Sequence, residues 1–163
     1  MAAPRATQRL TYSHTVGLVA MEGRGFSNPV DLAGGETRDT IPDLLDLTAA
    51  HPEVDAIVQL GLGIQGNTAA LTRSGPFHPD HGLERIVDFH ERQERRYAKA
   101  AAAAADAHGK PVLVASELAV ARPDNPMVVA VRDSGRLCYA SADRAVTALG
   151  HLVRYAARRR ART

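Results

Sequence analysis

The sequence predicts an α/β protein built around a mostly parallel sheet of about three to five strands. From Glu53 onward, short apolar runs alternate with longer stretches of helical character. This order is typical of parallel strands joined by crossover helices. The chain has 163 residues and is 45% hydrophobic, which is enough for one domain with a core. Aromatic residues make up only 4%, so the core is expected to consist mostly of Ala, Leu, Val and Ile.

The first expected elements lie in the N-terminal half. A short strand that ends in a glycine turn is expected within Asn28–Gly35. A helix then begins near Thr40, which can cap it, and Pro42 fits the first turn, where a missing N–H costs nothing. The run "VDAIVQL" (Val54–Leu60) predicts a buried strand that ends at glycines.

The later elements continue the alternation. Asp80 is a plausible N-cap for a long alanine-rich helix, which Gly109 ends. Small alanine side chains favour helix formation and let a helix lie close to a sheet. Four further elements are then expected: a strand at Pro111–Ser116, a helix at about Asn125–Asp133, a strand in "RLCYA", and a last helix capped by Ser141.

The ends of the chain have a different character from its middle. Residues 1–25 show no clear periodicity and are expected to be a linker or a remnant, while 158–163 form a basic tail. The formal net charge is only +2, and no base-reading motif accompanies the arginines, so neither nucleic acid nor a membrane is an expected partner. A single cysteine, Cys138, excludes an internal disulfide and favours a reducing compartment. No segment has the length of a signal peptide or a membrane span, so a cytoplasmic protein is expected.

Gly61, Gly63 and Gly66 form the pattern G-x-G-x-x-G directly after an apolar run. A dinucleotide site needs a second strand within about 30 residues and an acidic residue at its end. The next expected strand begins only near Pro111, and Ser74–Gly82 is expected to be a loop in place of an immediate helix. Binding of NAD or FAD is therefore a minor hypothesis. The glycines still mark the carboxyl end of a strand, where open α/β sheets bind ligands.

Several segments of the chain resemble a known family. They are "NPVDLAGGETRDTIPDLLDLTAAHPEVDAIVQLGLG", "GKPVLVAS" and "SGRLCYASADRAVTALGHLVRYAARRR". Together they are similar to the C-terminal CoA-ligase domain of NDP-forming acyl-CoA synthetases, a group that includes ADP-forming acetate–CoA ligases and is related to succinyl-CoA synthetase. The resemblance runs over about Phe26 to Arg160. It implies a flavodoxin-like three-layer sandwich over residues 26–157, without the usual first strand and helix.

The resemblance also implies a role in a multidomain ligase. Such enzymes convert an acid, ATP and CoA into acyl-CoA, ADP and phosphate through an acyl phosphate and a phosphohistidine. ATP with Mg²⁺ and CoA belong to the complete enzyme, and this domain alone is expected to bind none of them. The chain contains no CoA-binding Rossmann domain and no ATP-grasp domain, so it would need both as partners and is not expected to be active alone.

Two loops carry the site residues that the resemblance implies. Free N–H groups at a helix start and glycines that let an anion approach would suit a phosphoryl group or a carboxylate. Asn28 and Asp31 would brace the first turn, and no metal ligands are implied. The two loops comprise Gly34, Gly35, Glu36 and Thr37, and then Gly61, Leu62, Gly63 and Ile64.

His14 stands in "SHTVGLVA", which resembles the phosphohistidine motif of the same superfamily. Val16 replaces the expected glycine, and the motif normally lies in a different domain. His14 is therefore only a minor candidate for the phosphoryl carrier, and coincidence is the favoured interpretation.

Other reactive side chains favour ordinary structural roles. Ser74 and Ser116 lack the turn of a serine nucleophile, and Cys138 is expected to be an inert core thiol. Polar residues that could ligate a metal lack the spacing of a known zinc motif, namely His78, Asp80, His81, His90 and Glu94. The alternative to a ligase module is a non-catalytic remnant that acts as an interaction module, with homo-oligomers expected if an apolar surface is left uncovered.

Overall fold

The fold is a mixed α/β arrangement around one parallel sheet. A computed structural model describes residues 10–15, 30–32 and 40–162, with side chains described from residue 40 onward. The sheet has the order β2-β1-β3-β4-β5, and every neighbouring pair is parallel. The strands are β1 (Leu10–Thr15), β2 (Val30–Leu32), β3 (Ala56–Gln59), β4 (Val112–Ala115) and β5 (Cys138–Tyr139).

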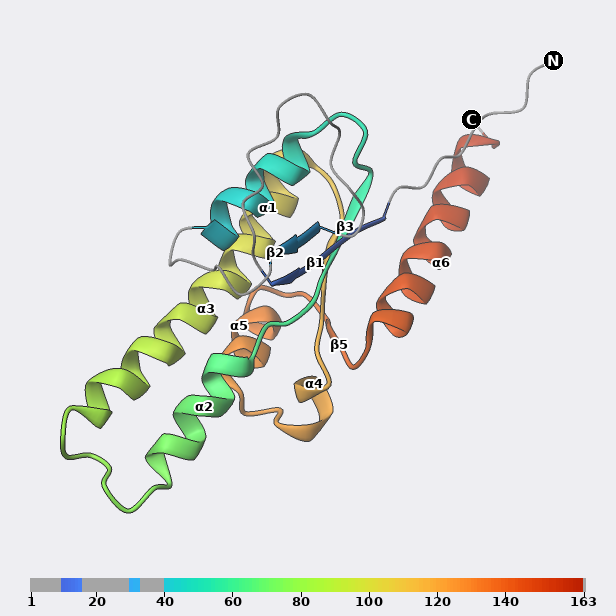
Figure 1. Ribbon diagram of the computed structural model, residues 1–163. Coiled ribbons are helices and arrows are strands. Elements are labelled where there is room, and N and C mark those ends of the chain that lie inside the picture. Colours follow the sequence, from blue (N-terminus) through green and yellow to red (C-terminus); the bar gives the residue numbers. More distant parts are fainter. Residues whose placement is uncertain (1–9, 16–29, 33–39, 163) are drawn as a thin grey trace.

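Six helices accompany the sheet in the described part of the chain. Helices α1, α3 and α5 lie on one side of it, and α6 lies on the other (Figure 1). Helix α2 runs beside the first half of α3 and extends beyond the sheet, and α4 is a single short turn (Figure 1). The helices are α1 (Thr40–Ala50), α2 (Ile64–Arg73), α3 (Leu83–His108), α4 (Leu118–Ala121), α5 (Pro126–Asp133) and α6 (Ala142–Arg160).

The core has two parts because the side chains of a strand alternate between the faces of a sheet. In β3, Ile57 points to the face that carries α1, α3 and α5. Its neighbours Ala56 and Val58 point to the face that carries α6, and there they pack with Ala145 and Leu149. Both central strands, β3 and β4, are buried along their whole length, as strands covered on two faces should be. The alanine-rich half of α3 packs into the larger cluster, as its small side chains predicted.

Most of the expected elements are confirmed with their boundaries. Helix α1 begins at Thr40 with Pro42 in its first turn, and α3 ends at Gly109, whose positive φ of 62° suits glycine. Asn125 caps α5, and Ser141 caps α6 by accepting the N–H of Arg144 at 3.3 Å. These local signals were sufficient because each depends only on neighbours in the chain.

The start of the chain departs from the expectation. Leu10–Thr15, within the segment expected to be a linker or remnant, forms strand β1 between β2 and β3. The expectation that the sheet lacks its first strand is therefore wrong. Strand β1 is held in the sheet because it pairs with β2 on one side and with β3 on the other. The polar and glycine-rich sequence around it did not indicate a strand. Residues 16–29, where a first helix would follow, lie outside the described residues.

Two expectations about the region after β3 are also wrong. Helix α2 follows the glycines at once, whereas no helix was expected before the loop; the loop expected at Ser74–Gly82 is confirmed and comes after α2. It buries only Gly66 and Ala69, so it has little of the apolar periodicity that reveals a helix. Helix α3 begins after Gly82 instead of being capped by Asp80, which offers its backbone carbonyl to the N–H of Leu83 at 3.0 Å.

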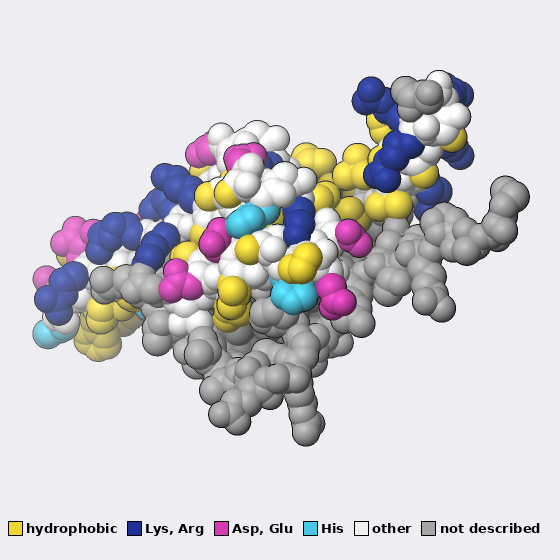
Figure 2. Space-filling view, turned by 90° about the horizontal axis from the view of Figure 1, so that it is seen from above, with side chains coloured by type: hydrophobic (Ala, Val, Ile, Leu, Met, Phe, Trp, Pro, Cys, Tyr) yellow, Lys and Arg dark blue, Asp and Glu magenta, His cyan; other side chains and the backbone are white. Residues whose placement is uncertain are grey.

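Helix α6 packs on the sheet only through its first half. Ala145 and Leu149 are buried, whereas Leu152 and Tyr155 are 54% and 62% exposed. The C-terminal half projects from the body of the molecule (Figure 1). Lys and Arg side chains gather around this projecting end, and hydrophobic side chains lie between it and the body (Figure 2).

A candidate binding crevice at the carboxyl ends of the strands

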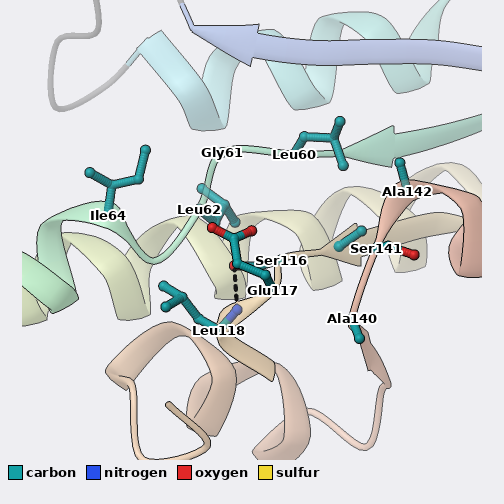
Figure 3. Close-up of a pocket in the computed structure, with 11 residues that line it drawn as sticks. Leu60, Gly61, Leu62, Ile64, Ser116, Glu117, Leu118, Ala140, Ser141 and Ala142 are labelled. Atoms are coloured by element: carbon teal, nitrogen blue, oxygen red, sulfur yellow. Dashed lines mark hydrogen bonds between the residues drawn. The ribbon is translucent and has the colours of Figure 1, made fainter. Parts of the chain in front are cut away.

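A crevice opens where β3, β4 and β5 end. Its volume is about 480 Å³, and it lies at the edge of the sheet where open α/β folds bind ligands. Three segments form its walls: the turn after β3, the turn after β4, and the start of α6 (Figure 3). The lining residues are Leu60, Gly61, Leu62, Ile64, Ala115, Ser116, Glu117, Leu118, Ala140, Ser141 and Ala142.

Among the described residues that line the crevice, three have polar side chains: Ser116, Glu117 and Ser141. The Ser116 hydroxyl accepts the N–H of Leu118 at 3.3 Å, and the Ser141 hydroxyl caps α6. Glu117 is exposed, and its carboxylate points toward the Gly61–Leu62 turn across the crevice (Figure 3). The start of α6 carries the partial positive charge of a helix N-terminus, which Asp143 in the same first turn offsets in part. The Glu117 carboxylate favours a hydrogen-bond donor at the opposite wall.

The three glycines of G-x-G-x-x-G have structural reasons to be glycine. Gly61 and Gly63 have positive φ angles of 79° and 99°, which other residues rarely adopt. A Cβ atom on Gly63 would lie 2.5 Å from Cδ1 of Leu118, and one on Gly66 would lie 2.9 Å from Nδ2 of Asn125. The pattern therefore permits a tight turn and a close approach between α2 and the start of α5.

Asn125 holds these two parts together. Its Nδ2 donates to the carbonyl oxygen of Gly63 at 3.0 Å, and its Oδ1 accepts the N–H of Met127 at 2.9 Å. Asn125 is 3% exposed, so both bonds are shielded from water. One side chain thus caps α5 and fixes the glycine turn at the same time.

The N-terminus of α2 is occupied by a carboxylate from the protein itself. Glu94 of α3 accepts the N–H of Gly63 at 2.8 Å through Oε2, and it accepts the N–H groups of Gln65 and Gly66 at 2.8 and 3.4 Å through Oε1. Glu94 is 2% exposed. Burial raises the pKa of this carboxyl group, and the three N–H bonds act in the opposite direction.

This internal carboxylate changes the interpretation of the glycine motif. A bound pyrophosphate or phosphoryl group would need the N–H groups at the start of α2. Those of Gly63, Gln65 and Gly66 are already bonded to Glu94. The α2 terminus therefore does not offer a nucleotide the cradle that the motif indicated. The walls of the crevice that a ligand could still contact are the Gly61–Leu62 turn, Glu117 and the start of α6.

The structure places only some of the sequence-predicted site residues at the crevice. Gly61, Leu62 and Ile64 line the crevice, whereas the N–H of Gly63 is turned toward Glu94. His14 lies in β1 directly opposite Asp31 in β2. The remaining residues lie outside the described part of the chain: Asn28, Gly34, Gly35, Glu36 and Thr37.

Sequence reasoning missed the structural role of Glu94 and the crevice positions of Glu117 and Ser141. Glu94 was considered as a possible metal ligand together with His90, and the favoured expectation was a polar residue on a helix face that points to solvent; its burial shows that expectation to be wrong. A usable signal was present, because Glu94 lies seven residues after Val87 and three before Tyr97, on the buried stripe of α3. An acidic residue on such a stripe needs a buried partner. Sequence alone did not indicate that this partner is backbone 31 residues away.

The other reactive side chains occupy unremarkable positions. Within residues 40–162 and the two described strands before them, no group of three or more His, Cys, Asp or Glu could hold a metal ion. Cys138 is partly buried, its Sγ lies 4.0 Å from Sδ of Met127, and burial raises the pKa of its thiol. The thiolate is therefore disfavoured, in line with the expected inert thiol. No helix among the described residues is long and apolar enough to cross a membrane.

Comparison with protein-family models finds no match for this chain. Searches of curated proteins and of solved structures find none either. The resemblance to the CoA-ligase domain therefore rests on the residues quoted above and stays a prediction.

Proposed function

We propose that the chain is a ligase module of an NDP-forming acyl-CoA synthetase, a flavodoxin-like domain that acts together with CoA-binding and ATP-grasp partners. The observation that carries the proposal is the crevice at the carboxyl ends of β3, β4 and β5, with the Gly61–Leu62 turn on its wall. The strand order 2-1-3-4-5 supports the flavodoxin-like assignment, because doubly wound sheets of that type use it.

In this role the crevice would hold the acid or its acyl phosphate. The negatively charged end of the ligand would face the start of α6, near Ser141, and its short carbon chain would lie against Leu60, Leu62 and Ile64. Glu117 would accept a hydrogen bond from the ligand or a partner. The partner domains would bind ATP with Mg²⁺ and CoA.

The test reconstitutes the reaction from separate parts. The purified chain is mixed with ATP, Mg²⁺, CoA, a short carboxylic acid, and the CoA-binding and ATP-grasp subunits of an NDP-forming synthetase. Formation of acyl-CoA above the level of those subunits alone is expected. The variant Ala140→Phe, which fills the crevice, should abolish the increase, whereas Val120→Ala on an exposed position should retain it. An increase that survives Ala140→Phe would contradict the proposed site.

The occupation of the α2 terminus by Glu94 favours a second candidate. A catalytic site for a phosphoryl group gains from free N–H groups, and here a structural carboxylate uses three of them. The chain could then be a non-catalytic interaction module on the same scaffold. Titration of the isotope-labelled chain with acetyl phosphate separates the two: shifts of the Gly61, Leu62 and Ser141 amide signals support the ligase module, and their absence supports the interaction module.

A further inference from the structure

The projecting half of α6 combines an apolar stripe with a dense basic surface. Buried Ala145 and Leu149 are followed at helical spacing by Leu152 and Ala156, so the stripe continues after contact with the sheet has ended. Leu152 is 54% exposed and Val153 is 40% exposed. An amphipathic stripe of this kind is normally covered by another element.

A groove beside the helix extends this apolar surface. Its volume is about 380 Å³, and Leu152 forms one wall. Leu137, which is 70% exposed, and Tyr139 contribute further apolar surface from β5 and the turn before it. We define the α6 patch as Leu137, Tyr139, Leu152, Val153 and Tyr155.

Positive charge gathers at the C-terminal end of the α6 patch. The last turns of α6 and the residues just after it contain five arginines, whereas the only acidic residue of the helix, Asp143, lies at its opposite end. Lys110 and Arg136 also line the groove, but the Lys110 ammonium donates to the carbonyl oxygens of Ala49 and His51, and Arg136 is paired with Asp106 at 2.6 Å. The arginines of α6 are therefore the main positive charge near the patch. The five arginines are Arg154, Arg158, Arg159, Arg160 and Arg162.

We infer that the α6 patch is a docking surface for an acidic amphipathic helix of a partner protein. A groove of this size accepts individual apolar side chains, and residues spaced i, i+3, i+4 and i+7 on a helix supply them. The arginines select for acidic flanks on the partner. A second copy of α6 is a poor occupant because it would bring its own arginines against these. The inference does not depend on the proposed ligase role.

A peptide titration tests the inference. The probe is a synthetic helix with leucine at i, i+3, i+4 and i+7 and with glutamate on the flanks, and its control has the same composition in scrambled order. Fluorescence anisotropy should detect binding of the amphipathic peptide only. Raising the salt concentration from about 0.05 M to about 0.5 M should weaken it, because exposed charges are screened. No binding at about millimolar peptide would overturn the inference.

Matched variants locate the binding surface. The double variant Leu152→Ala, Tyr155→Ala removes exposed apolar side chains and should weaken peptide binding by about tenfold or more. The triple variant Arg158→Gln, Arg159→Gln, Arg162→Gln should have a similar effect. The matched controls on the α2–α3 hairpin are Leu71→Ala for apolar exposure and Arg85→Gln for charge, and these should bind like the parent. Equal binding by the α6 variants and the parent would place the peptide elsewhere and refute the inference.

Other occupants give different results in the same assay. Binding to phosphatidylserine vesicles or to duplex DNA with higher affinity than to the peptide would assign the arginines to a membrane or to nucleic acid. A concentration-dependent dimer that the Leu152→Ala, Tyr155→Ala variant abolishes would assign the patch to a second copy. Either result would overturn the inference. Unchanged melting temperatures of all variants would show that the differences arise from binding and not from unfolding.

Discussion

The carboxylate of Glu94 accepts the N–H of Gly63 at 2.8 Å, although the two residues lie 31 positions apart. It joins the middle of α3 to the first turn of α2, and with Gln65 and Gly66 it forms three bonds of this kind. A buried carboxylate and the N-terminus of a helix therefore satisfy each other. Four predictions test this joint and the packing around it.

Replacing Glu94 should destabilise the fold strongly. Glu94→Ala leaves three N–H groups without an acceptor, two of them buried and one partly buried, which should lower the free energy of unfolding by about 3 kcal/mol or more. Glu94→Gln should also be destabilising, because its NH₂ group would face an N–H donor. Urea unfolding measures both, with the exposed Glu84→Gln as the control. A loss below about 0.5 kcal/mol for Glu94→Ala would show that the bonds contribute little.

The contribution of Glu94 to stability should depend on pH with a definite sign. Burial raises the pKa of Glu94 above its ordinary value of 4.5, so the folded protein holds this proton more tightly than the unfolded chain does. The favourable contribution is therefore complete below the unfolded pKa and is lost as pH rises through the folded pKa. The free energy of unfolding of the parent minus that of Glu94→Gln should decrease as the pH rises above the ordinary value of 4.5. A difference that increases with pH would mean that the N–H bonds outweigh burial.

Two glycine-to-alanine substitutions should have effects of opposite sign. Gly63→Ala places a Cβ atom at a φ of 99° and 2.5 Å from Leu118, which should cost about 1–3 kcal/mol. Gly150 lies inside α6 and meets only the flexible end of Arg154 at 3.4 Å, so Gly150→Ala should stabilise by about 0.5–1 kcal/mol. Thermal unfolding of both variants checks the pair. Similar effects at the two positions would argue against the described turn.

The stability of the fold should depend on the hydrogen bond that Asn125 donates as well as on the cap that it forms. Asn125→Ala loses both, and the lost cap alone should cost about 1–2 kcal/mol. Asn125→Asp keeps an acceptor for the Met127 N–H but places an oxygen against the carbonyl oxygen of Gly63. It should therefore also unfold more easily than the parent in urea. Parent-like stability of Asn125→Asp would show that only the cap matters.

Features set by neighbouring residues could be predicted from the sequence. The buried run Ala56–Gln59, the Gly109 stop and the Ser141 cap each depend on a few adjacent side chains, and all three are confirmed. The position of the Gly61–Ile64 turn at the end of a strand is confirmed for the same reason. Its role in ligand binding stays a prediction.

Features set by distant contacts could not be predicted in this way. Strand β1 depends on its pairing with β2 and β3, and its own sequence, "LTYSHT", has few of the apolar residues that mark a buried strand. Helix α2 shows little periodicity because α3 covers it through backbone and small residues, among them Gly66 and Ala69. Glu94 and the start of α2 are separated along the chain by the rest of α2, a loop and the first part of α3. No local sequence pattern therefore predicts their contact.

The position of Glu94 also bears on the order of events during ligand entry. The Glu94 carboxylate already binds the N–H groups at the start of α2. We therefore expect the turn to reach its final conformation when the chain folds, without a bound ligand. The amide protons of Gly63 and Gln65 should consequently exchange with deuterium about as slowly in the empty protein as in a loaded one. A ligand would meet a rigid wall, and association would involve no slow rearrangement of this turn.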